Sequence, residues 1–258
     1  MKRLSGARAV ITGSGRGIGR AIAIAYAREG AAVVLSARGG HAIAAVATEI
    51  IAAGGIAHAV VSDICDDAQV SELARAAQAH LGGPVTVLVN NAGTYLPKRF
   101  LDYTMSDWQR VLEVNVLGTV RVTRAFLSSM VQQRHGRIIN IASTAGKYGS
   151  YWQSAYNVSK HGIVGLTRCL ALETGAHGIR VNAICPGFVP TGMISPAQLA
   201  PLYGVAEDQV PTLLAQRAPI GRMASTEEIA ELAVYLASPA ADGMTGQALT
   251  LDGGAILV

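Results

Sequence analysis

Short apolar segments alternate with helix-forming segments along the whole chain of 258 residues, and this alternation limits the possible folds most strongly. Each apolar segment has the length and the aliphatic content of a strand that is buried on both faces. Strands separated by helices run parallel, so the pattern predicts an α/β fold, a doubly wound parallel sheet of about seven strands with helices on both faces. The predicted strands lie at residues 8–12, 31–36, 56–61, 85–90, 137–142, 179–184 and 248–251.

The segments between these strands carry apolar residues at helical spacing. Asp66 or Asp67 is expected to cap one helix, and Gly54-Gly55 to end another. No linker or repeat divides the pattern, so we expect a single domain over residues 1–258. The one long insertion, at about 190–216, is expected to form a substrate lid, because insertions of this size are usually functional. The predicted helices lie at residues 17–29, 42–53, 66–80, 107–131, 156–175 and 226–237.

Composition excludes several classes of protein. Half of the residues are hydrophobic and 15% are charged, which indicates a compact globular chain. The net charge of +4 comes from scattered Lys and Arg, so we expect no nucleic-acid partner. The cysteines and histidines lack metal-ligand spacing, so we expect no metal and a reducing compartment. The uncharged stretch 181–206 contains four prolines, and the N-terminal apolar run is too short for a signal sequence. We therefore expect a cytoplasmic protein without a membrane partner.

A glycine-rich turn joins the first predicted strand to the first predicted helix. Its glycines allow a tight turn and a close approach of the backbone to a ligand. The free N–H groups and the dipole of the helix that follows would then bind a pyrophosphate. The context predicts a Rossmann-type dinucleotide site whose residues include Gly13, Ser14, Arg16, Gly17, Ile18 and Gly19.

The end of the second predicted strand indicates which dinucleotide binds. An NAD(H) site usually places an acidic residue there to bind the ribose 2′-hydroxyl. This chain has Ser36-Ala37-Arg38 instead, and Arg16 lies on the same side. Because a guanidinium binds a 2′-phosphate by charge-assisted hydrogen bonds, the sequence favours NADP(H) over NAD(H). The alternative is that Arg38 is simply a solvated residue at a strand end.

Tyr156 and Lys160 are four residues apart, so on a helix they lie on one face. A phenol with an ordinary pKa of about 10 is a poor acid or base at neutral pH. A nearby ammonium would lower that pKa and suit the phenol to general acid/base catalysis. Ser143 supplies a hydroxyl that could hold a carbonyl or alcohol oxygen beside the phenol. Such pairs also occur by chance on surface helices, so the rest of the sequence has to support the assignment.

The motifs of this chain occur in the order found in short-chain dehydrogenase/reductases. The resemblance covers essentially the whole chain, and it adds to the glycine turn the elements Asn90-Asn91-Ala92-Gly93, Asn115, Ser143, Tyr156, Lys160, Pro186-Gly187 and Asp252-Gly253-Gly254. It implies that Tyr156 is the proton donor and acceptor and that Ser143 orients the substrate oxygen. It also implies that Lys160 binds the nicotinamide ribose and lowers the pKa of Tyr156, and that Asn115 holds a water molecule of a proton relay.

The same resemblance implies further contacts and an assembly. These proteins commonly form homotetramers through the helices that match 107–131 and 156–175 and through the C-terminal segment. The apolar tail 255–258 is consistent with such burial. The additional residues expected to bind the cofactor are Asp63, Ile64, Asn91, Ala92, Gly93, Pro186, Gly187, Val189 and Thr191.

The residues expected to surround the substrate are mostly aromatic or apolar, and no cation occurs among them before Arg217. A bulky hydrophobic or aromatic ketone, interconverted with a secondary alcohol, therefore fits better than a small anionic acid. The sequence thus predicts an NADP(H)-dependent alcohol dehydrogenase or carbonyl reductase. The expected substrate-binding residues are Tyr95, Gln153, Phe188, Met193 and Tyr203.

Two other substrate classes remain open. The Tyr203-Gly204-Val205 passage resembles 3-hydroxybutyrate dehydrogenases, but Tyr95, Ala145 and Gln153 stand where those enzymes place carboxylate-binding groups. The chain also looks like 3-oxoacyl-thioester reductases, whose substrate is attached to acyl carrier protein or coenzyme A, and like 3-hydroxyacyl dehydrogenases.

For the thioester reductases, Arg134 and Arg137 lie near the expected carrier-docking region, and His177 replaces a second expected arginine. A protein that senses NADP(H) without catalysis is less favoured, because such relatives usually lose the tyrosine or the lysine.

Overall fold

A computed structural model describes residues 2–257. Its sheet contains seven strands in the order β3-β2-β1-β4-β5-β6-β7, and every neighbouring pair is parallel. The predicted doubly wound parallel sheet is therefore confirmed. The strands are β1 (Arg8–Thr12), β2 (Ala32–Ala37), β3 (Ile56–Val61), β4 (Val87–Asn90), β5 (Gly136–Ile141), β6 (Ile179–Pro186) and β7 (Ala248–Leu251).

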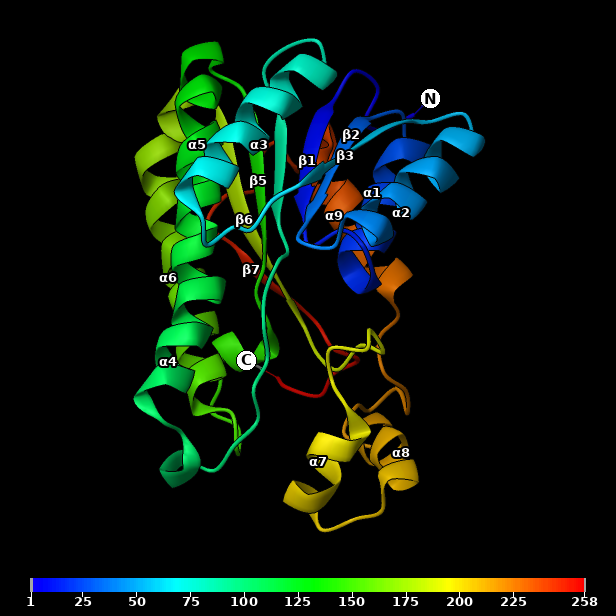
Figure 1. The fold of residues 1–258 in the computed structure, drawn as a ribbon, viewed down its shortest axis with the longest axis vertical. Coiled ribbons are helices and arrows are strands. Elements are labelled where there is room, and N and C mark those ends of the chain that lie inside the picture. Colours follow the sequence, from blue (N-terminus) through cyan, green and yellow to red (C-terminus); the bar gives the residue numbers. More distant parts are fainter. Residues whose placement is uncertain (1, 258) are drawn as a thin grey trace.

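Helices cover both faces of the sheet (Figure 1). The first, second and last helices lie on one face, and the third to sixth lie on the other. The seventh and eighth lie beyond the carboxyl ends of the strands. The helices are α1 (Gly17–Arg28), α2 (Gly40–Ala52), α3 (Asp67–His80), α4 (Met105–Leu112), α5 (Gly118–Gln133), α6 (Ser154–Thr174), α7 (Pro196–Tyr203), α8 (Val210–Ala215) and α9 (Thr226–Ala237).

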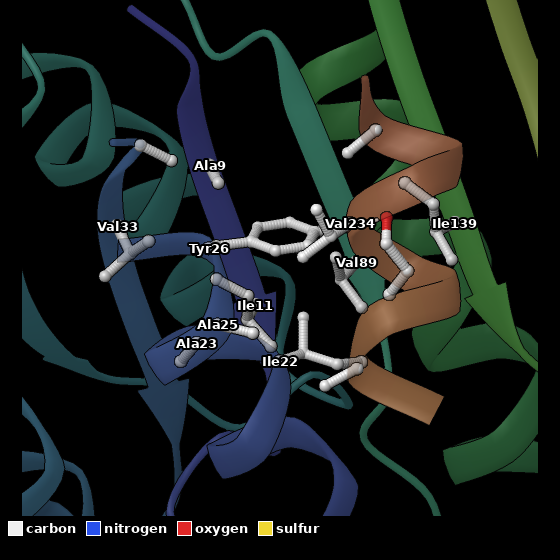
Figure 2. Packing of buried hydrophobic residues seen from close by; sticks show 14 of the residues in the cluster. Ala9, Ile11, Ile22, Ala23, Ala25, Tyr26, Val33, Val89, Ile139 and Val234 are labelled. Carbon is white, nitrogen blue, oxygen red and sulfur yellow. Dashed lines mark hydrogen bonds between the residues drawn. The ribbon is translucent and has the colours of Figure 1, made fainter. Parts of the chain in front are cut away.

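The core has two layers, one on each face of the sheet. Successive residues of β1 point to opposite faces: Ala9 and Ile11 pack with α1 and α9, whereas Val10 packs on the face covered by α3 and α5. Figure 2 shows the first layer, where Tyr26 of α1 lies beside Val234 of α9. Burial on both faces explains why the strands have continuous apolar sequences rather than alternating ones.

Helix ends follow the expected chemistry. The Asp66 side chain caps α3 by accepting a hydrogen bond from the Gln69 N–H at 3.0 Å. After α2, the N–H groups of Gly54 and Gly55 bond back to the carbonyls of Ile51 and Ile50, each at 2.9 Å. Gly54 has a φ of +80°, a left-handed conformation that favours glycine. Both sequence-based expectations about these helix ends are confirmed.

The helix expected over 107–131 differs from the prediction. It begins earlier, at Met105, because Thr104 and Asp107 form a reciprocal capping box. It is also interrupted: residues Glu113–Leu117 form a π-helical turn between α4 and α5. The pattern of apolar residues does not distinguish an α turn from a π turn, so only the structure reveals this widening, which includes Asn115.

The insertion after β6 contains two helices, α7 and α8, which form a small apolar cluster of their own. Leu199 of α7 and Leu214 of α8 are buried in it, and Tyr95 and Phe188 pack against it from the main body. The segment is therefore attached to the strand ends by apolar contacts. None of the helices in residues 2–257 is both long and apolar enough to cross a membrane.

We expect Tyr26→Phe to lower the free energy of unfolding by about 1 kcal/mol. The buried Tyr26 hydroxyl donates to the Ala233 carbonyl at 3.0 Å, and the variant loses this bond without changing the packed ring. Urea denaturation measures the change. Tyr151→Phe is the matched control. It removes the same hydroxyl group, but from a residue that is 81% exposed. Equal stability of both variants would contradict the assigned contribution.

Candidate active site

A cavity of about 630 Å³ opens at the carboxyl ends of the strands. The turns after β1, β4, β5 and β6 all contribute to its wall. It lies where β1 pairs with both β2 and β4, the point at which the connections change from one face of the sheet to the other. In doubly wound sheets, the crevice at such a point is the usual ligand site.

The glycine turn forms one wall of this cavity. Gly17 has a φ of +55°, and a Cβ atom on it would lie 2.9 Å from the Thr191 side chain. A Cβ on Gly13 would lie 2.8 Å from the backbone of Ala92. The turn is thus packed so closely against neighbouring loops that side chains at these positions would not fit. Within the described residues, no side chain caps the N-terminus of α1, so its N–H groups can bind an anion.

The end of the cavity beside the glycine turn is polar and cationic. Arg16 and Arg38 line it, and both side chains are exposed. The hydroxyls of Ser36 and Ser62, at the ends of β2 and β3, are buried there and have no hydrogen-bond partner among residues 2–257. Buried polar atoms normally have partners, so these two hydroxyls indicate a polar ligand beside the arginines.

Ser143, Tyr156 and Lys160 converge on the opposite part of the cavity. Ser143 follows β5, and its side chain accepts a hydrogen bond from the Ala145 N–H at 3.1 Å. Tyr156 and Lys160 lie one turn apart in α6, with the Lys160 Nζ 5.6 Å from the centre of the phenol ring. Lys160 Nζ donates to the Ile141 carbonyl at 2.8 Å, which fixes the ammonium under the strand end.

The electrostatics of this group differ from the sequence-based expectation. Burial raises the pKa of Tyr156 to about 12, and the hydrogen bond with Ser143 opposes that shift. Burial also lowers the pKa of Lys160 to about 8. The expected lowering of the Tyr156 pKa by Lys160 is therefore wrong for these residues by themselves. Desolvation of the charged form dominates at both groups.

Asn115 lies in the π-helical turn behind these side chains and is almost fully buried. Its side chain pairs with the backbone of Thr94: the Oδ1 accepts from the N–H at 2.7 Å, and the Nδ2 donates to the carbonyl at 2.9 Å. The Nδ2 also donates to Ser159 Oγ at 3.0 Å, and Ser159 Oγ donates to the Tyr156 carbonyl at 2.7 Å. Asn115 thereby links the loop after β4 to the helix that carries Tyr156.

The part of the cavity beside Tyr156, where the sequence predicts the substrate, is lined largely by aromatic side chains. Tyr95 lies edge-on to Tyr156, with ring centres 5.0 Å apart, and Gln153, Phe188 and Met193 also line the wall. Tyr203 does not line it. Its ring packs against Trp152 instead, with centres 5.0 Å apart. The sequence could not reveal this, because the turn of α7 that directs Tyr203 depends on packing within the insertion.

Most of the predicted cofactor-site residues line the cavity, but Ser14 and Gly19 do not. The Ser14 hydroxyl donates to the Ser36 carbonyl at 3.4 Å, and Gly19 packs against the glycine turn itself. The predicted cofactor-binding and catalytic residues that do line the cavity are Gly13, Arg16, Gly17, Ile18, Arg38, Asp63, Ile64, Asn91, Ala92, Gly93, Ser143, Tyr156, Lys160, Pro186, Gly187, Val189 and Thr191.

Sequence reasoning missed several lining residues. Ser36 and Ser62 could have been found, because Ser36 ends one predicted strand and Ser62 directly follows another, at the edge of the sheet where ligands bind. Arg110 and Val114 could not, because they reach the cavity from α4 and the π turn, whose orientation depends on tertiary packing.

Comparison with known proteins decides the family. A family model described as Enoyl-(Acyl carrier protein) reductase matches residues 13–255. The 3-oxoacyl-acyl-carrier-protein reductase FabG of Aquifex aeolicus (strain VF5) is 36% identical over 253 residues, which are 98% of this chain and 98% of that protein. The chain belongs to the short-chain dehydrogenase/reductase family. It is an oxidoreductase, and the resemblance inferred from its motifs is confirmed.

Solved structures of this family have the same fold. An actinorhodin polyketide ketoreductase variant with NADPH superimposes with a TM-score of 0.93 at 37% identity, covering 96% of each chain. A proposed NAD(P)-dependent gluconate 5-dehydrogenase from Beutenbergia cavernae with bound NADP gives a TM-score of 0.88 at 41% identity, covering 97% of each chain. These members differ in substrate, so family membership alone does not define the substrate of this chain.

We expect Lys160→Met to change the pH dependence of stability. The pKa of Lys160 is about 8 in the folded protein and 10.5 ordinarily, so the unfolded chain binds more protons between these values. Wild-type stability therefore gains from this group as pH rises from 8 to 10.5, and the neutral variant lacks that gain. The free energy of unfolding of the variant minus that of the wild type should therefore fall by about 1–3 kcal/mol over this range. Denaturant titrations of both proteins at several pH values measure it, and a constant difference would contradict it.

Proposed function

We propose that this protein is an NADP(H)-dependent carbonyl reductase that interconverts a bulky hydrophobic or aromatic ketone and a secondary alcohol. The convergence of Ser143, Tyr156 and Lys160 in one cavity with the glycine turn carries the proposal. A phenol, a hydroxyl and an ammonium beside a dinucleotide cradle are the groups that a hydride transfer to a carbonyl requires.

NADP(H) fits the residues of the cavity. The unpartnered hydroxyls of Ser36 and Ser62 and the guanidinium groups of Arg16 and Arg38 form a polar, cationic end suited to a 2′-phosphate. The free N–H groups at the start of α1 suit the pyrophosphate. The two solved relatives described above were crystallised with NADPH or NADP, which supports the same choice here. When bound, the cofactor supplies the hydride.

In the reductive direction, Tyr156 transfers its phenolic proton to the carbonyl oxygen while the carbonyl carbon gains the hydride. Ser143 holds that oxygen beside the phenol. The raised pKa of Tyr156 keeps the phenol protonated at neutral pH but makes it a weaker acid, so the transfer needs positive charge beside the ring. Lys160, fixed by the Ile141 carbonyl, brings positive charge close to the ring as it becomes a phenolate. Asn115 positions α6 through Ser159.

The substrate class follows from the aromatic wall around Tyr95, Phe188 and Met193. Within the described chain, the cations that line this cavity are Arg16 and Arg38 beside the glycine turn, Arg110 of α4, and Lys160 beside Tyr156. Because the wall beside Tyr156 is aromatic, the groups that flank the reacting carbonyl are apolar in this proposal. We propose that α7 and α8 form a lid, because Phe188 and Tyr95 pack directly against them.

A 3-oxoacyl-thioester reductase is the second candidate, favoured by the similarity to FabG of Aquifex aeolicus and to a polyketide ketoreductase. One expectation for carrier docking is corrected by the structure. Arg137 is buried and ion-paired with Asp242, so it is not on the surface. Arg134 is exposed, and its guanidinium donates to the Ala176 carbonyl at 2.8 Å. NADPH oxidation with aryl ketones and with acetoacetyl thioesters separates the two candidates.

We also propose a homotetramer in a reducing compartment such as the cytoplasm. Leu117, Val158 and Leu172, on the π turn and α6, are 47%, 51% and 86% exposed, which suits burial against another subunit. The described cysteines are all unpaired thiols, as a reducing environment allows. Light scattering that gave a monomer would contradict the assembly.

We expect Tyr156→Phe to lower kcat at least about 100-fold, because the variant keeps the ring but lacks the transferable proton. The dissociation constant for NADPH should change less than about threefold, since the phenyl ring still fills the site. Stopped-flow NADPH oxidation and fluorescence titration measure the two quantities. Tyr235→Phe on α9 is the control with the same atomic change away from the cavity. Unchanged turnover in Tyr156→Phe would exclude its role as the proton donor.

We expect Arg38→Ala to raise the dissociation constant for NADPH about 10- to 100-fold while changing that for NADH far less. The variant removes a charge-assisted contact that only the 2′-phosphate can make, which is worth about 1.5–3 kcal/mol. Fluorescence titration with both nucleotides measures the ratio. Arg75→Ala serves as the control, because Arg75 pairs only with Glu72 on α3. An equal loss for both nucleotides would show that Arg38 does not read the phosphate.

A further inference from the structure

A second cavity of about 260 Å³ adjoins the first. The two share four lining residues, so they lie side by side against the same stretch of wall. The shared residues are Thr144, Tyr148, Gly187 and Phe188. The remaining wall of the smaller cavity comes from Arg217, Ala255 and Ile256, near the C-terminus. It is therefore apolar except for the Thr144 and Tyr148 hydroxyls and one guanidinium.

That guanidinium is held in place by an aromatic ring. Arg217 lies over the ring of Tyr203, 4.9 Å from its centre, and Nη1 donates to the Tyr203 hydroxyl at 3.2 Å. Within residues 2–257, Arg217 has no carboxylate within 4.0 Å, in contrast to Arg222 on the same segment, which pairs with Glu228 at 2.8 Å. Arg217 thus presents a positioned, unneutralised cation to the cavity.

Tyr203 is itself fixed by Trp152. The two rings meet edge-on, with centres 5.0 Å apart and an interplanar angle of 84°. Trp152 has a φ of +61°, a left-handed conformation that is strained for a bulky residue, and its carbonyl accepts a hydrogen bond from the Lys98 N–H at 2.7 Å. The ring contact with Tyr203 and the hydrogen bond from Lys98 hold the Trp152 backbone in this strained conformation. A chain of contacts from Trp152 through Tyr203 therefore sets the position of Arg217.

We propose that Arg217 binds an oxyanion, a carboxylate or a phosphate, at the end of the substrate remote from the reacting carbonyl. This inference rests on the proposed carbonyl reductase activity and narrows its substrate class. The ketone end occupies the aromatic part of the first cavity beside Tyr156, and the chain continues past Tyr148 and Phe188 into the second cavity. A planar guanidinium held by Tyr203 matches the two oxygens of such an anion.

The experiment compares charged and neutral ketones in wild type, Arg217→Gln and Arg222→Gln. One pair is benzoylbutyrate and its methyl ester, which differ only in the carboxylate. The other pair is acetoacetyl coenzyme A and the acetoacetyl thioester of N-acetylcysteamine, which lacks the phosphates. For at least one pair, the ratio of kcat/KM for the charged to the neutral member should fall at least tenfold in Arg217→Gln and stay unchanged in Arg222→Gln. If the ratio falls for the benzoylbutyrate pair, the anion that Arg217 binds is a carboxylate. If it falls for the coenzyme A pair, the anion is a phosphate.

Binding provides a readout that does not need turnover. Isothermal titration of the NADPH-loaded Tyr156→Phe protein, with and without Arg217→Gln, should show at least tenfold weaker binding of the charged ligand without the arginine. Ratios and affinities that are the same with and without Arg217, or no binding of either charged ligand, would overturn the inference. Arg217-dependent binding in a wild-type enzyme that reduces no carbonyl would instead support the inference and contradict the proposed function.

Discussion

The pairing of β1 with both β2 and β4 is the constraint on which the site depends. Because all strands are parallel, every strand ends at the same edge of the sheet, and because the connection after β1 goes to one face and that after β4 to the other, their loops diverge. The crevice that results brings the glycine turn, the strand-end hydroxyls and the phenol of Tyr156 together from distant parts of the sequence. Without this order of strands the same residues would be separate turns and caps.

Burial then decides what these groups can do. The pKa values of Tyr156 and Lys160 move in opposite directions because desolvation favours the neutral form of each. The phenol remains protonated at neutral pH, and the Lys160 ammonium donates to the Ile141 carbonyl, which holds it in place. Burying the charged Lys160 lowers the free energy of unfolding at neutral pH. Strained backbone conformations at ligand sites have a similar cost.

The substrate side is built by contacts between residues far apart in the chain. Asn115, in the π turn, joins the loop after β4 to α6, and its side chain both donates to and accepts from the backbone of Thr94. Trp152 and Tyr203 join the loop before α6 to α7. These contacts place aromatic rings beside Tyr156 and leave Arg217 in the wall of the smaller adjoining cavity. One sheet edge thus supports both the proposed hydride-transfer site and the proposed extension of it.

The sequence by itself determined the parallel sheet, the glycine turn and the pairing of Tyr156 with Lys160, because these follow from local patterns: apolar strands, glycine spacing and helix periodicity. Only the tertiary structure decided that Arg137 is buried, that Tyr203 contacts Trp152 rather than the cavity, and that burial raises the pKa of Tyr156. The physical reason is that solvent exposure and side-chain direction depend on which distant elements pack together. Residue spacing determines which face of a helix a group occupies, but not what lies opposite that face.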